Sequence, residues 1–375
     1  MRIGSNAHRT THLRIASAFA AGAIFISLAG CSAGTPTPEE TGGTATEAID
    51  GFNAMTGTAR HDALVAAAQE EGVVVFYSTA PGWQPVLDAF SDTYDVDVEV
   101  FNGRSDTILQ RVVQEYQAGL NSVDVFEDEN AALLEETPGI TANYVNDELT
   151  SQIPGYDGAA MVPFRLSVPA VTWNTDLVSD DEVPLTIEDL ADPKWDGKLT
   201  LDSGAWEWYA GVYGYLSDKG WDDAKIEDFF TTIISYSNPQ ATSIAETALL
   251  SAGEYSMATG ILTQVASRTA AKGSPIAWQT AEGRYVTPLI IAPEGGVLMA
   301  NSPHPAAAML LMDFILTEGA QLLLDNGTFI NSAVPLEGGP MSNVKSEDTI
   351  VLDTNALMLE RDKWSQAWDA LVRKQ

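Results

Sequence analysis

Short polar stretches follow apolar runs in the first third of the chain, and they carry groups that could bind a small molecule. The stretches are Ser78-Thr79, Gly103-Arg104-Ser105 and Glu127-Asp128-Glu129. Backbone N–H groups around Gly103, at the start of a helical pattern, could hold an anion together with the Arg104 guanidinium. The hydroxyls could add hydrogen-bond donors, whereas the carboxylates could attract a cation. We therefore expect a solute to contact these positions.

The elements that position these stretches can be predicted from the pattern around them. Strands are expected at residues 73–77, 96–101 and 123–126, and the first is a continuous apolar run, which is typical of a strand buried on both faces. Helices are expected between these strands, because apolar residues recur there at helical spacing. They are Trp83, Val86, Leu87, Phe90 and Tyr94 in the first helix and Ile108, Val112 and Tyr116 in the second. Ser105 could simply cap the second helix. Such alternation predicts a parallel sheet with ligands beyond the carboxyl ends of its strands.

A second α/β stretch repeats this arrangement. Strands are expected at residues 168–173, 199–201, 254–260 and 295–299, and helices after Trp206, at 244–252 and from Pro305. Ser203-Gly204 follows the second of these strands and repeats the polar strand end. Trp206 could close over an apolar or cationic face of a solute, and Tyr209 could supply a phenolate. The spacing of Trp208 and Tyr213 favours packing in a core.

Catalytic motifs are absent from the sequence. Beyond the first 30 residues the only histidines are His61 and His304, and the only cysteine is Cys31. Neither a Gly-x-Ser-x-Gly nor a His-Glu-x-x-His motif occurs. We therefore expect a binding protein with no enzymatic activity and no cofactor. A secreted hydrolase that uses carboxylates alone is the alternative from another class, and a structural role at the cell surface is a further one.

The composition restricts the class of protein. The chain has 375 residues, of which 45% are hydrophobic, and 52 acidic against 19 basic residues give a net charge of −33. These values are typical of a globular protein, and the length suggests two domains. No basic patch is visible, so nucleic-acid binding is not expected. An acidic surface also favours solubility and weak adhesion to anionic membranes.

The N-terminus resembles a bacterial lipoprotein signal. Arginines 2, 9 and 14 precede an apolar stretch at residues 15–29, which is shorter than the roughly 20 residues that span a bilayer. The stretch ends in Leu28-Ala29-Gly30-Cys31. This ending is similar to a lipobox, where a peptidase cleaves before Cys31 and the thiol receives diacylglycerol. An ordinary signal peptide with a stray thiol is the alternative.

These features predict an exported protein that a lipid holds at the outer face of the cell membrane. The signal peptide would cover residues 1–30. Residues 31–58 would form a flexible tether, because residues 35–44 are rich in Thr, Pro and Gly and lack apolar side chains to bury. The rest of the chain has no second apolar stretch of about 20 residues.

The order of several short motifs resembles a known family. The motifs are VVVFYS at 73–78, NGRS at 102–105, DVF at 124–126, WNT at 173–175, DPKW at 192–195, SGAW at 203–206, AGE at 252–254 and NSPHP at 301–305. In this order, they are similar to the extracellular solute-binding proteins of ABC importers, of the two-lobed kind that includes ferric-ion-binding proteins. The resemblance implies capture of a small solute between two lobes and its delivery to a membrane permease.

The resemblance also implies an architecture. It is the α/β type 2 periplasmic-binding-protein fold, in which each lobe is a mixed, mostly parallel sheet flanked by helices and crossover strands join the lobes. We expect residues 59–165 and 283–331 to form lobe 1, and residues 166–282 and 332–375 to form lobe 2. The expected partners are the solute, an ABC permease and the membrane through the lipid on Cys31, and the protein should be a monomer.

Ferric ion is the solute that this resemblance suggests first. Its ligands in the family would fall near Pro81, at Glu129, and on a tyrosine pair expected at residues 261–264. Only Glu129 matches, because the last positions read Ile261-Leu262-Thr263-Gln264. Tyr209 or Tyr213 could supply one phenolate ligand. One phenolate and one carboxylate together would make a poor iron site. We therefore expect no directly coordinated metal.

An organic solute with a carboxylate, phosphonate or phosphate group fits the residues better. It would contact the polar strand ends of both stretches, and Arg165 lies close to the family's crossover arginines. A polyamine or quaternary ammonium remains an alternative within the same class, because aromatic faces attract such cations. Trp83, Trp206, Tyr209 and the carboxylates at 127–129 could then contribute.

Overall fold

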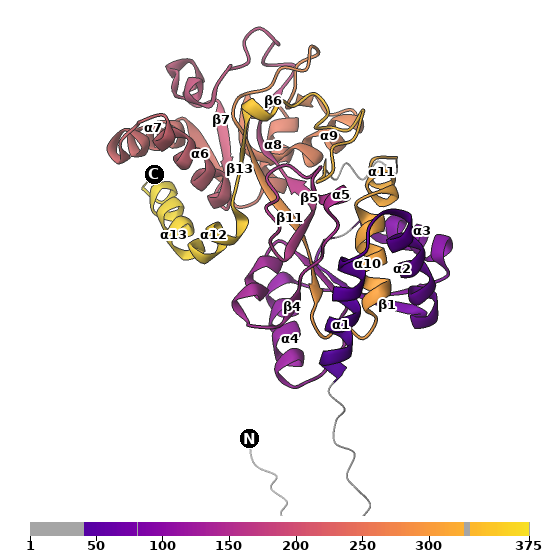
Figure 1. Cartoon of the computed structure of the whole chain (residues 1–375). Helices are drawn as coiled ribbons and strands as arrows, with labels where there is room; N and C mark the ends of the chain where they lie inside the picture. The colour runs from indigo at the N-terminus through magenta and orange to yellow at the C-terminus, as the bar shows by residue number, and fades with distance from the viewer. Residues whose placement is uncertain (1–40, 81, 326–330, 375) are drawn as a thin grey trace, which may run out of the picture. The chain divides into compact units, whose positions relative to one another are not determined.

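The computed structural model describes residues 41–80, 82–325 and 331–374, which lie within one compact unit at residues 40–375. This unit contains two β-sheets covered by helices (Figure 1). The first sheet has the strand order β12-β5-β11-β3-β1-β2, with β4 and β13 paired to β11, and the second has the order β10-β6-β9-β7-β8. The α/β class and the two-sheet architecture predicted from the sequence are therefore confirmed.

The first three predicted strands form as expected. They are β1 (Val73–Ser78), β2 (Asp97–Asn102) and β3 (Val125–Asp128), and the helices between them are α3 (Gln84–Tyr94) and α4 (Ser105–Gln117). Strand β1 pairs in parallel with both β2 and β3. Since Ser78 pairs with Glu127 in this register, the carboxyl ends of the two strands lie together.

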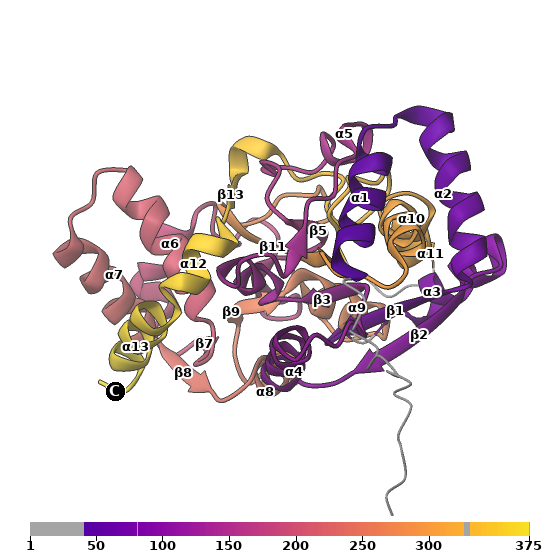
Figure 2. The same cartoon turned by 60° about the horizontal axis from the view of Figure 1, so that its bottom comes forward.

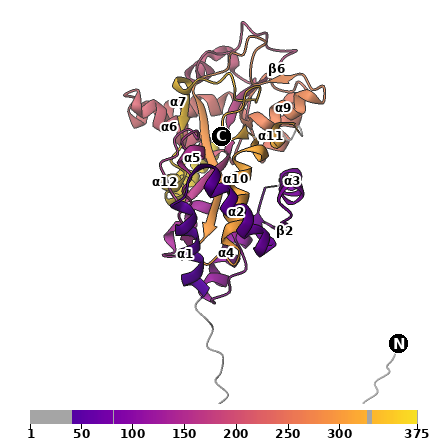
Figure 3. The same ribbon diagram turned by 45° about the vertical axis from the view of Figure 1, so that its right-hand side comes forward.

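Helix α10 (Pro305–Ile315) forms the centre of the first core. All eleven of its residues are buried, and its proline occupies the first turn, where a missing N–H costs no hydrogen bond. Helices α1 (Thr41–Asn53) and α2 (Gly57–Glu71) both contact it and lie beside it in Figure 3. Among the described residues no single helix is long and apolar enough to cross a membrane; α10 and α11 (Glu318–Asp325) reach that length only as a pair bent by 50°.

The second sheet has its own core. Its strands are β6 (Pro169–Asn174), β7 (Leu199–Asp202), β8 (Ser237–Gln240), β9 (Met257–Leu262) and β10 (Ile276–Ala277). Helices α6 (Trp206–Asp218), α7 (Asp223–Ser235), α8 (Ser243–Ser251) and α9 (Thr263–Ala271) accompany them. The C-terminal helix α13 (Arg361–Val372) contacts α6 and α7 and adds Trp368 to this core. Figure 2 shows α6, α7 and α13 at the opposite end of the unit from α2 and α3.

Two long segments connect the sheets. Strand β5 (Met161–Ser167) in the first sheet continues into β6 in the second after the single residue Val168. Strand β11 (Leu289–Met299) pairs antiparallel with β5, is buried along its whole length and also contacts β6. The pairing shifts between Glu294 and Gly295, where the backbones approach closely: a Cβ on Gly295 would lie 1.9 Å from the Val162 carbonyl oxygen.

The remaining described elements are short. They are the strands β4 (Thr141–Ala142), β12 (Asn331–Ser332) and β13 (Thr349–Val351), the α-helices α5 (Asp147–Thr150) and α12 (Thr354–Leu359), and the 3₁₀ helices η1 (Ala131–Glu136), η2 (Ile187–Ala191), η3 (Pro193–Trp195) and η4 (Ser346–Asp348). Helix α12 contacts η1 and β11, so the C-terminal segment reaches the first sheet before α13 joins the second core.

The structure corrects the predicted tether. Residues 31–58 were expected to be flexible, but α1 begins at Thr41 and α2 begins at Gly57. Ala45 and Ile49 on α1 are buried, because the helix packs against α10. The strand expected at 254–260 also begins later, at Met257. The predicted signal peptide and Cys31 lie outside the described residues.

Candidate solute-binding site

The polar strand ends predicted from the sequence meet at the edge of the first sheet. The Ser78 hydroxyl donates to the Glu127 carboxylate over 2.6 Å, and the Thr79 hydroxyl donates to the Asp128 carboxylate over 2.6 Å. Glu127 and Asp128 are fully buried. Residues at the ends of neighbouring parallel strands have thus come together, as the topology requires.

The first turn of α4 joins the same edge through Asp128. The Ser105 hydroxyl donates to Asp128 over 2.7 Å, and the backbone N–H of Asn130 donates to the same carboxylate over 2.7 Å. Ser105 therefore does not cap its helix, because Arg104 occupies the N-cap position and makes no side-chain cap. The three hydroxyls expected to donate to an anionic solute thus donate to carboxylates. The oxygens of Ser78 and Ser105 also accept, from the Ala80 N–H and from the Asn130 side chain.

Gly103 and Arg104 lie on the exposed part of this edge. A Cβ on Gly103 would lie 3.0 Å from Ile108, so the position suits glycine because α4 packs closely behind it. Glu129 is also exposed to solvent, yet the surrounding protein and the charge of Asp128 raise its pKa. The positive charges of Arg165 and Arg361 act in the opposite direction and lower the pKa of Glu129.

Arg165 connects the edge to the crossing strands. Its Nε donates to Glu127 over 2.9 Å, and its guanidinium also pairs with Glu294, the residue directly opposite on β11. Although Arg165 lowers the pKa of Glu294, burial and the charges of Glu129 and Glu127 raise it to about 7. The charge of Arg165 is therefore already shared between two carboxylates, which makes it a positioning residue for them.

The second sheet contributes Glu207, on the first turn of α6. Burial raises the pKa of Glu207 to about 7, and the charges of Glu294 and Glu129 contribute to the rise while Arg361 opposes it. Glu207 is partly buried and forms no hydrogen bond or ion pair with any residue that the structure describes. Glu129, Glu207 and Glu294 thus repel one another electrostatically, and together with Glu127 and Asp128 we call them the acidic cluster.

The strand end before α6 is acidic as well. Asp202, the last residue of β7, accepts a hydrogen bond of 2.7 Å from the Gly204 N–H, and the Ser203 N–H donates to the Gln240 carbonyl over 2.9 Å. Glu246 on α8 is fully buried, and neither of its carboxyl oxygens has a hydrogen-bond partner of normal geometry. Burial and the charge of Asp202 raise the pKa of Glu246, and the Thr259 backbone offsets only part of this effect.

Several aromatic and apolar candidates lie in the cores instead. Tyr209 is buried and stacks on Trp368 with ring centroids 5.4 Å apart, and Ile261 has no exposed surface. Trp83 is also buried, in edge contact with Phe76 and Phe164. Tyr209 and Ile261, which were predicted to contact the solute, are thus buried in the cores of this structure. Trp206 is only partly buried, against the second core.

Sequence reasoning missed four charged residues near the site, which are Glu207, Glu246, Glu294 and Arg361. A usable signal existed for one of them: Glu294 interrupts an otherwise apolar run at residues 289–299, and a charge within a buried strand requires a partner. No local pattern marks Glu207, which follows Trp206 on a helix that was otherwise expected to pack in the core.

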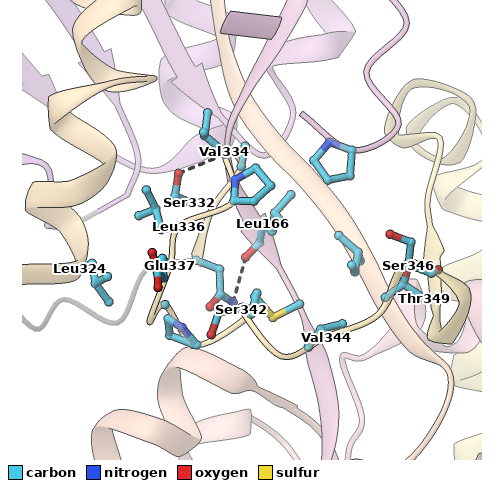
Figure 4. A pocket seen from close by; sticks show the side chains of 18 residues that line it. Leu166, Leu324, Ser332, Val334, Leu336, Glu337, Ser342, Val344, Ser346 and Thr349 are labelled. Carbon is cyan, nitrogen blue, oxygen red and sulfur yellow. Dashed lines mark hydrogen bonds between the residues drawn. The ribbon is translucent and has the colours of Figure 1, made fainter. Parts of the chain in front are cut away.

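A cavity lies beside strand β5. Its volume is about 450 Å³, and Leu166, the neighbour of Arg165 on β5, lines it together with the segment at residues 331–346 (Figure 4). Among the polar groups there, the Ser332 hydroxyl accepts from the Val334 N–H over 3.1 Å, whereas the buried Asn331 Oδ1 has no hydrogen-bond partner among the described residues. Successive residues on a strand point to opposite faces, so this cavity is separated from Arg165 by β5.

Comparison with known proteins identifies the class. A sequence profile of the family described as bacterial extracellular solute-binding protein matches residues 78–322, which is more than half of the chain. The chain belongs to this family of ABC-transporter solute-binding proteins, as the motif order in the sequence suggested. Iron uptake protein A1 of Synechocystis sp. (strain ATCC 27184 / PCC 6803 / Kazusa) is similar, with 24% identity over 273 residues, which are 66% of this chain and 72% of the relative.

Solved structures share the fold at low sequence identity. The FutA (IdiA) protein of Trichodesmium in complex with iron and citrate has a TM-score of 0.63 and 18% identity, over 80% of this chain and 99% of the other. The periplasmic binding protein AfuA of Actinobacillus pleuropneumoniae, with fructose-6-phosphate bound, has a TM-score of 0.56 and 17% identity, over 80% and 99%. Since the two neighbours hold such different ligands, the fold alone does not define the solute of this chain.

Proposed function

We propose that this protein captures one small solute between the carboxyl-end edges of its two sheets and passes it unaltered to an ABC permease. The observation that carries the proposal is the polar edge where β1 and β3 end, because Arg165 joins its Glu127 to the crossing strands β5 and β11 that lead into the second sheet. Groups on two separate sheets can hold a ligand between them, and relative movement of the two sheets can release it.

An iron cargo is suggested by the names of two similar proteins, but this chain offers few of the necessary ligands. Tyr209 is in a core, Tyr213 donates its hydroxyl to Asp223 over 2.7 Å, and the segment at residues 261–264 carries no tyrosine. The described residues contain no group of three or more His, Cys, Asp or Glu arranged to hold a metal ion. An organic solute is therefore the better-supported cargo.

We further propose that the lipid on Cys31 tethers the protein at the outer face of the cell membrane. This rests on the lipobox-like ending at residues 28–31. The tether would be shorter than the sequence suggested, because α1 begins at Thr41. Anchoring raises the effective concentration of the receptor near its permease, which gives the lipid a physical purpose. The protein would act as a monomer and without catalysis.

Two measurements test this function. Mass spectrometry of small molecules released from the purified, denatured protein, with metal analysis alongside, should recover one solute in near-stoichiometric amount. The same solute should raise the melting temperature and be recovered unchanged, whereas its chemical conversion would support a hydrolase instead. Membrane fractionation of Cys31→Ser should show release from the membrane, and unchanged fractionation would contradict lipidation.

A further inference from the structure

We propose that the cavity beside β5 is a second binding site, which takes a neutral and mostly apolar small molecule with one hydrogen-bond donor. Its volume of about 450 Å³ falls within the range of roughly 300–1,000 Å³ that is typical of ligand pockets. The cavity lies on the other face of β5 from Arg165, outside the candidate solute-binding edge. A ligand there would add to the proposed function and would not depend on it.

The wall of this cavity is built from elements that lie far apart in the sequence. Leu166 on β5 and Ile291 on β11 line it, and so do Leu324 on α11 and Thr349 on β13. Leu324 and Thr349 lie on opposite sides of this space in Figure 4. Strand β11 pairs with both β5 and β13, so backbone hydrogen bonds hold three of these four positions. The cavity is therefore part of the fold and not a gap beneath one loop.

The segment at residues 331–346 supplies most of the remaining wall. Its backbone is held near both ends: the Ala333 N–H donates to the Phe164 carbonyl on β5 over 3.1 Å, and the Lys345 N–H donates to the Tyr285 hydroxyl over 2.9 Å. Between these anchors, the N–H of Ser342 donates to the carbonyl of Gly339 over 3.0 Å within a turn. Such anchoring favours a preformed cavity, as ligand pockets usually are.

The chemistry of the lining favours a neutral ligand. Leucine, isoleucine, valine, methionine, proline and alanine residues make up most of the lining, and Glu337 is the only ionisable residue among the described residues that line it. Glu337 is exposed to solvent, so a charged ligand would find no buried counter-charge in the cavity. An apolar molecule instead gains free energy when its surface leaves water for such a lining.

Asn331 gives an independent indication of what the ligand carries. It lines the cavity with only 1% of its surface exposed. Its Nδ2 donates to the Thr263 hydroxyl over 2.8 Å and to the Leu166 carbonyl over 3.4 Å, so these acceptors fix which way the amide points. Its Oδ1 is left as a buried acceptor with no hydrogen-bond partner among the described residues. Because an unpaired buried acceptor is costly, a ligand with one N–H or O–H group directed at this oxygen is favoured.

The test uses N-phenyl-1-naphthylamine, a neutral probe with one N–H donor that becomes more fluorescent in apolar surroundings. With the purified full-length protein we expect saturable binding of one probe per chain and a raised melting temperature. 1-Benzylnaphthalene, in which a methylene group replaces the N–H, should bind about threefold more weakly in competition. 8-Anilinonaphthalene-1-sulfonate, which adds a negative charge, should bind about tenfold more weakly. Absence of saturable binding, or equal binding of either analogue, would overturn the proposal.

Variants assign the probe to this cavity. Val344 is a partly buried residue of its wall, so Val344→Phe should fill part of the space and weaken probe binding about tenfold. Val145→Phe makes the same change at an exposed position outside the lining and should leave the affinity unchanged. Met341→Trp, at another partly buried position of the wall, is a second filling variant, and melting temperatures without probe check that each variant folds. If the folded filling variants bind the probe as tightly as the wild type, the proposal fails.

Discussion

Arg165 and Glu294 oppose each other directly across the antiparallel strands β5 and β11, and their side chains form an ion pair at that position. Three residues later the chain leaves β5 for β6 in the second sheet. The pair therefore sits where the chain passes from one sheet to the other, and Arg165 also holds Glu127 at the solute-binding edge. The same guanidinium thus links the crossing strands to the site.

Removal of this guanidinium should be strongly destabilising. Arg165→Met would leave Glu127 and Glu294 without a counter-charge among buried groups, so we expect a loss of about 3–5 kcal/mol in the free energy of unfolding, measured by chemical denaturation. Arg373→Met, which removes an exposed ion pair with Asp369, should cost less than about 1 kcal/mol. Similar losses for the two variants would contradict the role given to Arg165.

The solute-free protein should lose stability as the pH rises toward neutrality. Glu207 and Glu294 have a folded-state pKa of about 7 against an ordinary value of 4.5, so the folded state binds their protons more tightly. Each therefore destabilises the fold increasingly between about pH 4.5 and 7, by up to about 3 kcal/mol before coupling between them is considered. Melting temperatures across this range should fall less steeply for Glu207→Gln than for the wild type, whereas Glu254→Gln, on the exposed turn before β9, should keep the wild-type slope.

Alanine substitutions at two glycines should have opposite effects on stability, because one glycine is closely packed and the other lies on an exposed helix face. Gly295→Ala would place a Cβ against the backbone of Val162 on β5, so it should cost at least about 2 kcal/mol of unfolding free energy. Gly214→Ala adds a Cβ on an exposed face of α6 with nothing within 4 Å, and should stabilise the helix by up to about 1 kcal/mol. Chemical denaturation of both variants tests the contrast, and an equal effect would show that the β5–β11 approach relaxes easily.

Local patterns predicted the elements of the fold but not the charges that meet between them. The apolar run at 73–77 and the helical spacing after Trp83 were sufficient to place β1 and α3. Helix α1 was missed because its first turn is made of Thr and Gly, and its stability depends on burial of Ile49 against α10. Whether a helix of this kind forms is decided by tertiary packing more than by propensity.

The contacts at the candidate site could be predicted from the sequence only in part. Parallel topology predicted that Ser78 and Glu127 would meet, because strand ends share an edge. It could not show that the hydroxyl of Ser78 donates to that carboxylate, so this donor is already used within the protein. The electrostatic repulsion between Glu207 and Glu294 depends on how the second sheet sits against β11, and no local sequence pattern encodes that arrangement.

His304 forms a pH-sensitive ion pair with Asp124, outside the candidate site. Its Nδ1 lies 2.9 Å from the Asp124 carboxylate, which raises the pKa of His304, with smaller contributions from Glu71 and Glu99, while burial lowers it. Stabilisation by the charged pair is therefore complete below the ordinary pKa of 6.5 and is lost as the pH rises through the higher folded value. His304→Asn should lower stability at pH 6 more than at pH 9, whereas substitution of the exposed His61 by Asn should change neither. An equal loss at both pH values, measured by urea denaturation, would show that the ring acts by packing rather than by charge.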